Sequence, residues 1–185
     1  SQRWSEPGPI EYAILYDSGW TERTTGKLSE TINPNQNILQ SLSESSLSGT
    51  LNFSSGNNII VTDGQAKTYR GLDGDDTYFI SNLLPKNSSI EIIDTSGNNT
   101  IQIASNTKVK KTLWTQDAAR LTFDDDRVIT INGADKFTFN LGGNITTGEE
   151  GSNVSFSELA FYFGINDISN ISDAETGVVT DLYII

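Results

Sequence analysis

The chain has 185 residues, with 24 acidic and 12 basic side chains, and its net charge at pH 7 is −12. This excess of carboxylates argues against a nucleic acid or an anionic membrane surface as a partner, because both are bound through Lys and Arg. Cys, His and Met are absent, which excludes disulfides, zinc fingers, thiol nucleophiles and serine hydrolysis through a histidine. No stretch of the sequence approaches the roughly 20 apolar residues of a membrane-spanning helix.

The first 50 residues differ in composition from the rest of the chain. They contain one predicted strand, at residues 10–16, and then a stretch rich in Ser, Asn and Glu at residues 27–50. The polar stretch is typical of a loop or linker, with one short helix predicted at residues 37–43. We therefore divide the chain into an N-terminal strand plus a polar linker-like segment, residues 1–50, and a β-rich domain, residues 51–185.

From residue 51 onward, short apolar runs recur, and each follows Gly, Asn or Asp. Examples are "NFSSGNNIIV", "GLDGDDTYFI" and "SSIEIIDTSGNNTIQIA", and later "LTFDDDRVITING", "DKFTFNLGG" and "GVVTDLYII". The runs are rich in Ile, Val, Phe and Tyr, which favour strands. Strands bounded by turn residues in close succession predict an all-β fold.

Four of the turns form an internal repeat. Each has a glycine, then two or three small polar or acidic residues, then an alternating apolar strand, and the glycines are Gly56, Gly74, Gly97 and Gly133. The successive glycines are 18, 23 and 36 residues apart. Glycine permits the left-handed backbone of such a turn, and the Asp and Asn that follow add oxygen atoms, which are the ligands of hard cations such as calcium.

The best-formed copy, "GLDGDDTYFI", resembles the nonapeptide G-G-x-G-x-D-x-U-x of the RTX, or haemolysin-type calcium-binding, proteins. The glycines of that motif correspond to Gly71 and Gly74. Its aspartate corresponds to Asp76 and its large apolar residue to Tyr78. The resemblance implies calcium binding, parallel strands and a secreted or cell-surface location.

The resemblance extends over residues 54–103. In the RTX family two nonapeptides make one turn of a parallel β-roll, which matches the 18-residue spacing of the first two glycines. The other copies depart from the motif, since Asn58 and Asn99 stand in place of its aspartate. We therefore expect one or two calcium ions, and an all-β fold in which a short parallel β-roll or β-helix segment continues into antiparallel strands. A β-sandwich with a calcium-bearing loop is the alternative.

The predicted calcium site lies in and around the best-formed copy. Six residues are expected to build it: Asp73, Asp75, Asp76, Gly71, Gly74 and Asp63. The carboxylates would bind the ion directly, and the glycines would let backbone carbonyls converge on it. The alternative is a solvated acidic turn that binds no ion.

Two further segments have competing interpretations. "LTFDDDRVITI" favours a strand–turn–strand hairpin, in which residues 121–123 pair with residues 128–131, over a second cation site. "SFSELAFYFGI" favours a short helix that is capped by Ser157 and turns its aromatic side to the sheet. A strand at residues 161–165 is the alternative.

Composition and resemblance together favour an extracellular structural or adhesive module without an enzymatic activity. We expect it to be part of a larger secreted or cell-surface protein, or the subunit of a surface layer or filament that binds copies of itself. One alternative is a calcium-dependent carbohydrate-binding module, which would present Trp20, Trp114 and Tyr162 to surface glycans. Another is a polysaccharide-active enzyme domain.

Overall fold

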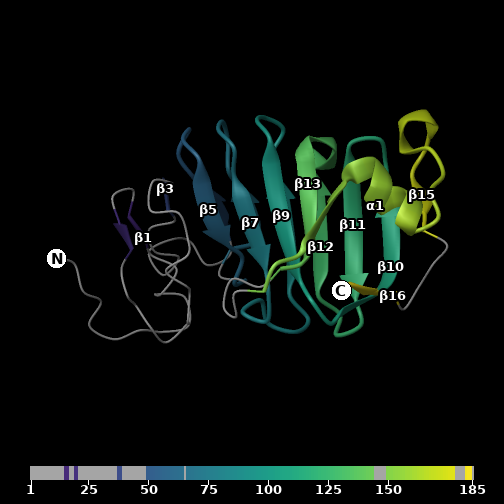
Figure 1. Ribbon diagram of the computed structural model, residues 1–185, viewed down its shortest axis with the longest axis horizontal. Helices are drawn as coiled ribbons and strands as arrows, with labels where there is room; N and C mark the ends of the chain where they lie inside the picture. The colour runs from purple at the N-terminus through teal and green to yellow at the C-terminus, as the bar shows by residue number, and fades with distance from the viewer. Residues whose placement is uncertain are drawn as a thin grey trace.

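The computed structural model describes residues 15–16, 19–20, 37–38, 49–64, 66–143, 149–177 and 182–184, and it contains two mixed β-sheets (Figure 1). The long sheet has the order β15 (Glu175–Thr176), β10 (Thr107–Trp114), β11 (Ala118–Phe123), β12 (Val128–Asn132), β8 (Ser89–Ile93), β6 (Thr68–Arg70) and β4 (Thr50–Asn52), with β16 (Leu182–Ile184) also beside β10. The short sheet has the order β14 (Ser152–Ser155), β13 (Phe137–Gly142), β9 (Asn99–Ala104), β7 (Thr77–Ile80), β5 (Asn58–Val61) and β3 (Asn37–Ile38). Strands β1 (Leu15–Tyr16) and β2 (Gly19–Trp20) form a separate antiparallel pair.

Successive strands alternate between the two sheets, so each pair of strands forms one rung of a parallel β-roll. Strand β4 pairs in parallel with β6, and β5 with β7, and the paired residues are 18 positions apart. The next rung, β8 and β9, follows at a spacing of 23 residues. The rungs succeed one another along the long axis of the molecule in Figure 1. These parallel pairings confirm the predicted β-roll, and they differ from the antiparallel sheets of the β-sandwich alternative.

The roll continues beyond residue 103 with one more rung, formed by β12 and β13. An antiparallel hairpin, β10 and β11, is inserted in the chain before this rung. After the hairpin, β12 pairs in parallel with β8, and β13 with β9. The insertion accounts for the 36-residue spacing between Gly97 and Gly133. Strand β11 runs antiparallel to both β10 and β12, which confirms the predicted continuation into antiparallel strands.

The core lies between the two sheets, and it is formed by residues that stack from rung to rung. In the long sheet, Leu51, Tyr69, Ile92 and Ile131 occupy equivalent positions on β4, β6, β8 and β12. All four are buried. In the long sheet, the alternating pattern along strands such as β8 and β12 sends one side chain into the core and the next to a more exposed outer face. In the short sheet, β5 and β7 are buried at nearly every position.

The acidic turn between β11 and β12 is the predicted hairpin turn, and the pairing covers residues 118–122 and 128–132 where residues 121–123 and 128–131 were expected. Two of its three carboxylates have cationic partners within the chain. Asp125 forms an ion pair with Arg127 at 3.0 Å, and Asp126 forms one with Lys110 at 2.6 Å. These contacts support the hairpin interpretation over a second cation site.

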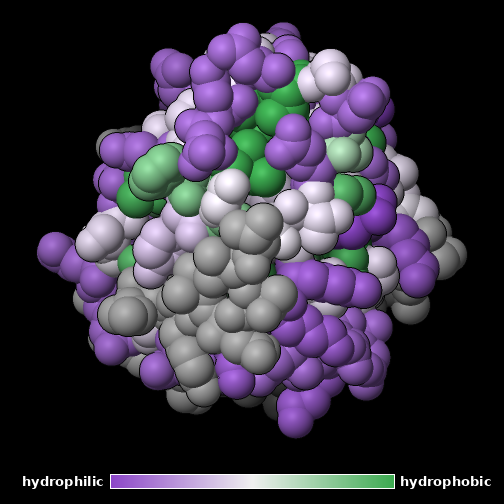
Figure 2. All heavy atoms as spheres, turned by 90° about the vertical axis from the view of Figure 1, so that its right-hand side faces the viewer, coloured by the Kyte–Doolittle hydropathy of each residue, from purple (hydrophilic) through white to green (hydrophobic). Residues whose placement is uncertain are grey.

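Helix α1 (Phe156–Tyr162) confirms the predicted helix and covers the inner face of the inserted hairpin. It lies in front of β10 and β11 in Figure 1. Trp114 of β10 is fully buried, and its ring centroid lies 5.7 Å from that of Phe156 and 6.0 Å from that of Phe163. Figure 2 views this end of the molecule and shows apolar patches, in green, among hydrophilic atoms.

The N-cap of α1 is Ser155, so the prediction of Ser157 is wrong. The Ser155 hydroxyl accepts the Glu158 N–H at 3.1 Å, and the Ser155 N–H donates to the Glu158 carboxylate at 2.7 Å. This reciprocal pair is a capping box. Ser157 lies two residues further on, inside the first turn of the helix.

We expect Ser155→Ala to lower the free energy of unfolding by about 1 kcal/mol, because the first turn of α1 loses its side-chain acceptor. Ser157→Ala is the matched control, since this serine is exposed on the helix, and it should change stability by less than about 0.5 kcal/mol. Urea unfolding followed by circular dichroism measures both variants. Equal losses would contradict the role assigned to the capping box.

Two predictions for the first 50 residues can be compared in part with the structure, because residues 15–16 and 37–38 are described. Strand β1 covers residues 15–16 of the strand predicted at 10–16, and the remainder lies outside the described residues. Residues 37–38 were expected to start a helix but form β3, because they pair with β5 at the edge of the short sheet; residues 39–43 are not described. None of the helices within the described ranges has the length and apolar character needed to cross a membrane.

Candidate functional site

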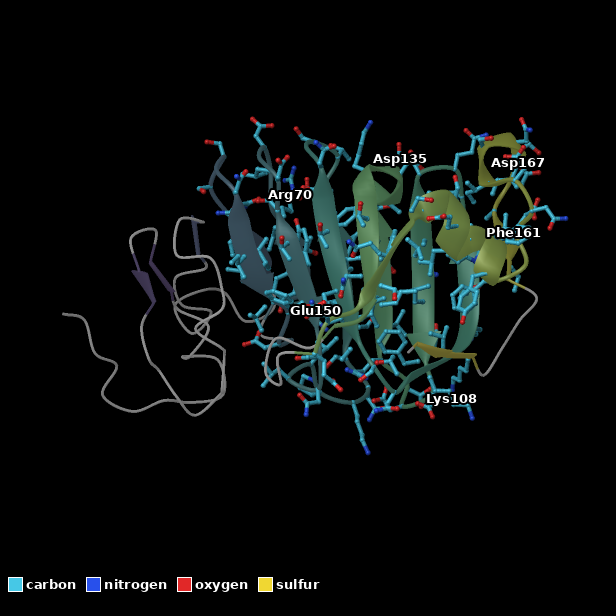
Figure 3. All side chains as sticks on the ribbon, in the orientation of Figure 1. Arg70, Lys108, Asp135, Glu150, Phe161 and Asp167 are labelled. Atoms are coloured by element: carbon cyan, nitrogen blue, oxygen red, sulfur yellow. The ribbon has the colours of Figure 1, made fainter. Side chains whose placement is uncertain are left out.

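One edge of the roll is formed by the glycine turns that lead into the short-sheet strands. This edge is at the top of Figure 3, where Arg70 and Asp135 are labelled. Gly74 and Gly97 have left-handed backbones, with φ of 95° and 86°. A Cβ atom at either position would lie under 3.0 Å from the carbonyl oxygen of the turn glycine one rung earlier. The turns therefore stack directly on one another through their backbones.

A ladder of side chains connects the stacked turns on the inside of the roll. The Asn58 N–H donates to Asp76 Oδ1 at 2.8 Å, and the Asp76 N–H donates to Asn99 Oδ1 at 2.9 Å. We call this the inner ladder. The three residues occupy equivalent positions in successive turns, and Asn99, which replaces the motif's aspartate, accepts a backbone N–H with its side chain as Asp76 does.

A second ladder runs along the outside of the same turns. The Asp75 N–H donates to Asn57 Oδ1 at 2.7 Å, and the Asn98 N–H donates to Asp75 Oδ1 at 2.9 Å. We call this the outer ladder. Asp75 is exposed, whereas Asp76 is fully buried, because successive side chains point to opposite sides of an extended chain.

Beneath the turns, Asp76 and Asp94 form a buried pair of carboxyl groups. Asp76 is 0% and Asp94 2% exposed. The Tyr78 hydroxyl donates to Asp94 Oδ2 at 2.7 Å and accepts the Gly71 N–H at 2.8 Å. A Cβ atom at Gly71 would lie within 2.6 Å of Asp76 Oδ2, Tyr78 Oη and Asp94 Oδ2, so these three oxygen atoms converge on the space that the glycine leaves open.

Burial raises the pKa of Asp76 to about 8, and the negative charges of Asp94 and Asp75 add to the rise, while the hydrogen bond from the Asn58 N–H opposes it. Burial also raises the pKa of Asp94, although its hydrogen bonds with Tyr78 and Asp76 act in the opposite direction. The pKa of Tyr78 is raised by burial and by Asp94. Two such carboxyl groups in contact favour sharing one proton at neutral pH, unless a cation takes its place.

Asp94 and Tyr78 were not predicted as site residues. Asp94 reaches the site because the long-sheet register places Arg70 opposite Ile93, and hence Gly71 beside Asp94. On the other side of Asp94, Gly133 approaches so closely that a Cβ there would lie under 3.0 Å from the Asp94 carbonyl oxygen. The available signal was the alignment of the turns at a spacing of 23 residues, which brings an aspartate into the glycine position.

The structure brings together only some of the six predicted calcium-site residues. Gly71 and Asp76 belong to the buried cluster, and Gly74 lies in the glycine stack above it. Asp73 and Asp75 are exposed on the outer side of the turns. Asp73 Oδ1 accepts the Ser96 hydroxyl at 3.0 Å, so the two outer carboxylates contact the next turn and do not join Asp76.

Asp63 lies at the opposite edge of the roll. It follows β5, whereas Asp76 precedes the neighbouring parallel strand β7. The separation is about five residues of extended chain, or about 16 Å at ~3.3 Å per residue. Asp63 is buried there, and its Oδ1 accepts the Tyr69 hydroxyl at 3.3 Å. It therefore does not share a site with Asp76.

The buried cluster matches a hard cation in donor type but not in donor number. Calcium binds six to eight oxygen atoms at roughly 2.3–2.6 Å. Asp76, Asp94 and Tyr78 supply oxygen atoms only, and within the described residues no three His, Cys, Asp or Glu side chains gather closely enough to hold a metal. An ion held by these two carboxylates would complete its shell with backbone carbonyls and water.

The aromatic residues proposed as a glycan platform do not form one surface. Trp114 is 0% exposed, and its indole N–H donates to Thr112 Oγ1 at 2.8 Å, so the expectation that it is presented to glycans is wrong. Tyr162 is 47% exposed and its neighbour Phe161 64%. The side chain of Trp20 lies outside what the structure describes.

Comparisons with known proteins give no relative: no family model matches the chain, and neither a curated protein nor a solved structure matches it.

Proposed function

We propose that the chain is an extracellular, calcium-stabilised structural or adhesive module, within a larger secreted or cell-surface protein or as the subunit of a surface layer or filament. The observation that supports this proposal is the Asp76–Asp94 pair, two buried carboxyl groups that meet Tyr78 beside Gly71. Gly71 and Asp76 belong to the motif that resembles the RTX nonapeptide. The proposal assigns no catalytic step to the chain.

Each residue of the cluster has a physical role in this proposal. Asp76 and Asp94 hold the ion, the Tyr78 hydroxyl orients Asp94, and Gly71 leaves space for the converging oxygen atoms. A bound calcium ion supplies the positive charge that lets both carboxylates ionise. Because the chain has a net charge of −12, it repels itself at low calcium, and binding of the ion favours the folded state.

Thermal unfolding in EDTA, in millimolar calcium and in millimolar magnesium tests this function. Calcium at about 100 times its dissociation constant should raise the free energy of unfolding by about 2.7 kcal/mol, and magnesium, which demands a smaller octahedral site, should raise it less. Asp94→Asn should lose the calcium response. The control is Asp73→Asn, because Asp73 is exposed and lies outside the buried pair.

Two results would contradict the proposal. If calcium does not raise the unfolding temperature of the wild-type protein, the module is not stabilised by calcium. If Asp73→Asn loses the response and Asp94→Asn keeps it, the ion binds on the outer side of the turns and the buried pair is not its site.

A further inference from the structure

A groove of about 610 Å³ crosses the outer face of the long sheet, over β8, β10, β11 and β12. It is large enough for a small organic ligand, since such sites enclose about 300–1,000 Å³. Its floor consists of outward-facing residues, whose neighbours along each strand point into the core. On β11, for example, Arg120 is exposed whereas Leu121 is buried.

Two rows of side chains run from β10 to β12 across this groove. One row contains Lys111, Thr122 and Val128, and the other contains Leu113, Arg120 and Thr130. Ser89 and Thr176 add two more hydroxyl groups to the lining. Neighbouring strands are about 4.8 Å apart, so the groove presents cations, hydroxyl groups and apolar surface at intervals similar to the spacing of substituents along a sugar chain.

Two cations in the groove are available to an anionic ligand. Lys110 is paired with Asp126 at 2.6 Å, but neither Lys111 nor Arg120 forms an ion pair with another described residue. The Arg120 Nε–H donates to Thr130 Oγ1 at 3.1 Å, which fixes the plane of the guanidinium. A basic concavity on a chain with twice as many acids as bases favours an acidic ligand by charge complementarity.

We propose that this groove binds an acidic oligosaccharide, with sugar carboxylates at Lys111 and Arg120 and sugar hydroxyls at the threonines. The guanidinium fork matches the geometry of a carboxylate, and Leu113 and Val128 offer apolar surface to the C–H face of a sugar ring. The inference names the ligand class of the adhesive module, and in that respect it rests on the proposed function.

The size and charge of the surroundings favour a sugar chain over an acidic protein. A stable protein interface buries about 800 Å² on each partner, which would bring an acidic partner onto carboxylates beside the groove, such as Glu91, which lies next to Thr130 on the neighbouring strand. A narrow sugar chain stays within the groove. Asp126 lines the groove, but its charge is paired with Lys110, so the ligand meets the two cations with less repulsion than the rest of a −12 chain imposes.

Calorimetric titration of the full chain with trigalacturonate, at low salt and at a fixed free calcium concentration, tests the inference. We expect binding that weakens as salt is added, and no binding of maltotriose, a neutral sugar of the same length. The double variant Lys111→Gln/Arg120→Gln should bind at least about tenfold more weakly, since each charge-assisted contact is lost. The control, Lys67→Gln/Lys86→Gln, removes the same charge from exposed positions outside the groove and should change affinity less than about twofold.

Equal affinity in the two double variants would overturn the inference. Equally tight binding of a triglutamate peptide would overturn the assignment to a sugar and point to a protein partner. Sugar binding by a wild-type protein that shows no calcium response would support the groove and contradict only the proposed function. A calcium response without sugar binding would contradict the groove and leave the calcium proposal intact.

Discussion

Replacement of Gly97 by alanine is expected to lower the free energy of unfolding by about 3 kcal/mol, and the midpoint of thermal unfolding by about 10 °C. Gly97 has φ of 86°, and a left-handed backbone costs an alanine about 1–2 kcal/mol. The larger cause is the stacking of the turns, since the new Cβ would lie under 3.0 Å from the Gly74 carbonyl oxygen. Because that oxygen belongs to the backbone of the preceding rung, relief of the contact requires the two rungs to separate.

Gly64→Ala is the matched control for this prediction. Gly64 has a similar backbone, with φ of 82°, but its Cβ would meet side-chain atoms of Pro85 and Ser88 at 3.2 and 3.3 Å. Gly64→Ala should lower the free energy of unfolding only by the cost of the left-handed backbone for an alanine, about 1 kcal/mol. Chemical unfolding of both variants in urea measures the difference. Equal losses would show that the contact between stacked turns adds nothing to the cost of the backbone conformation.

The repeat of glycine turns made much of this fold predictable from the sequence. Each glycine precedes a short apolar strand, and the spacing of Gly56 and Gly74 equals one rung of the roll. The hairpin at residues 121–131 was predictable because its acidic turn separates two alternating strands. Both features are set by residues that are close together in the sequence, so they can be predicted from one sequence alone.

The parts of the site that were missed depend on register between distant strands. The position of Asp94 beside Gly71 follows from the pairing of β6 with β8, and the spacing of that rung is 23 residues instead of 18. The 23-residue spacing of Gly74 and Gly97 places Asp94 beside Gly71 only if the additional residues lie before Asp94, and the sequence alone does not show where they lie. Likewise, helix α1 covers the hairpin only because β10 and β11 lengthen one sheet, which creates an inner face for Trp114 to occupy.

One property of the site could have been predicted and was not. Tyr78 corresponds to the large apolar residue of the motif, a residue type that favours the interior, and side chains alternate along an extended chain. Asp76 therefore had to share the inner side with Tyr78, and Asp75 had to face outward, as the two ladders show. Treating the acidic residues as one cluster of ligands overlooked this alternation.

Asp76→Asn is expected to make the protein more stable than the wild type at pH 8 in EDTA, and equally stable at pH 4. The pKa of Asp76 rises from its usual 3.8 to about 8 in the folded protein. Between these values the unfolded chain has released a proton that the folded protein still holds. The stability of the wild type is therefore complete below pH 4 and falls as the pH rises to about 8.

The size of the effect follows from the same difference in pKa. Each pKa unit corresponds to about 1.4 kcal/mol, but the raised pKa belongs to the Asp76–Asp94 pair and not to Asp76 alone. Because the variant keeps Asp94, we expect about 2–3 kcal/mol at pH 8 rather than the full difference. The introduced amide can still accept the Asn58 N–H in the inner ladder, so the variant keeps the backbone contact and loses only the ionisable group.

Urea unfolding at intervals between pH 4 and 9, in EDTA and in calcium, measures this prediction. Asp75→Asn is the control, because its neighbours in the outer ladder are already asparagines. The charge of Asp75 is the smallest of the causes that raise the pKa of Asp76, so the pH dependence of this variant should be only slightly weaker than that of the wild type. Calcium should remove the loss of stability at high pH in the wild type, since it takes the place of the shared proton, and should have no effect on Asp76→Asn. If Asp76→Asn loses stability with rising pH as steeply as the wild type, the buried pair is not the source of the pH dependence. Calcium would then have no shared proton to replace at Asp76 and Asp94.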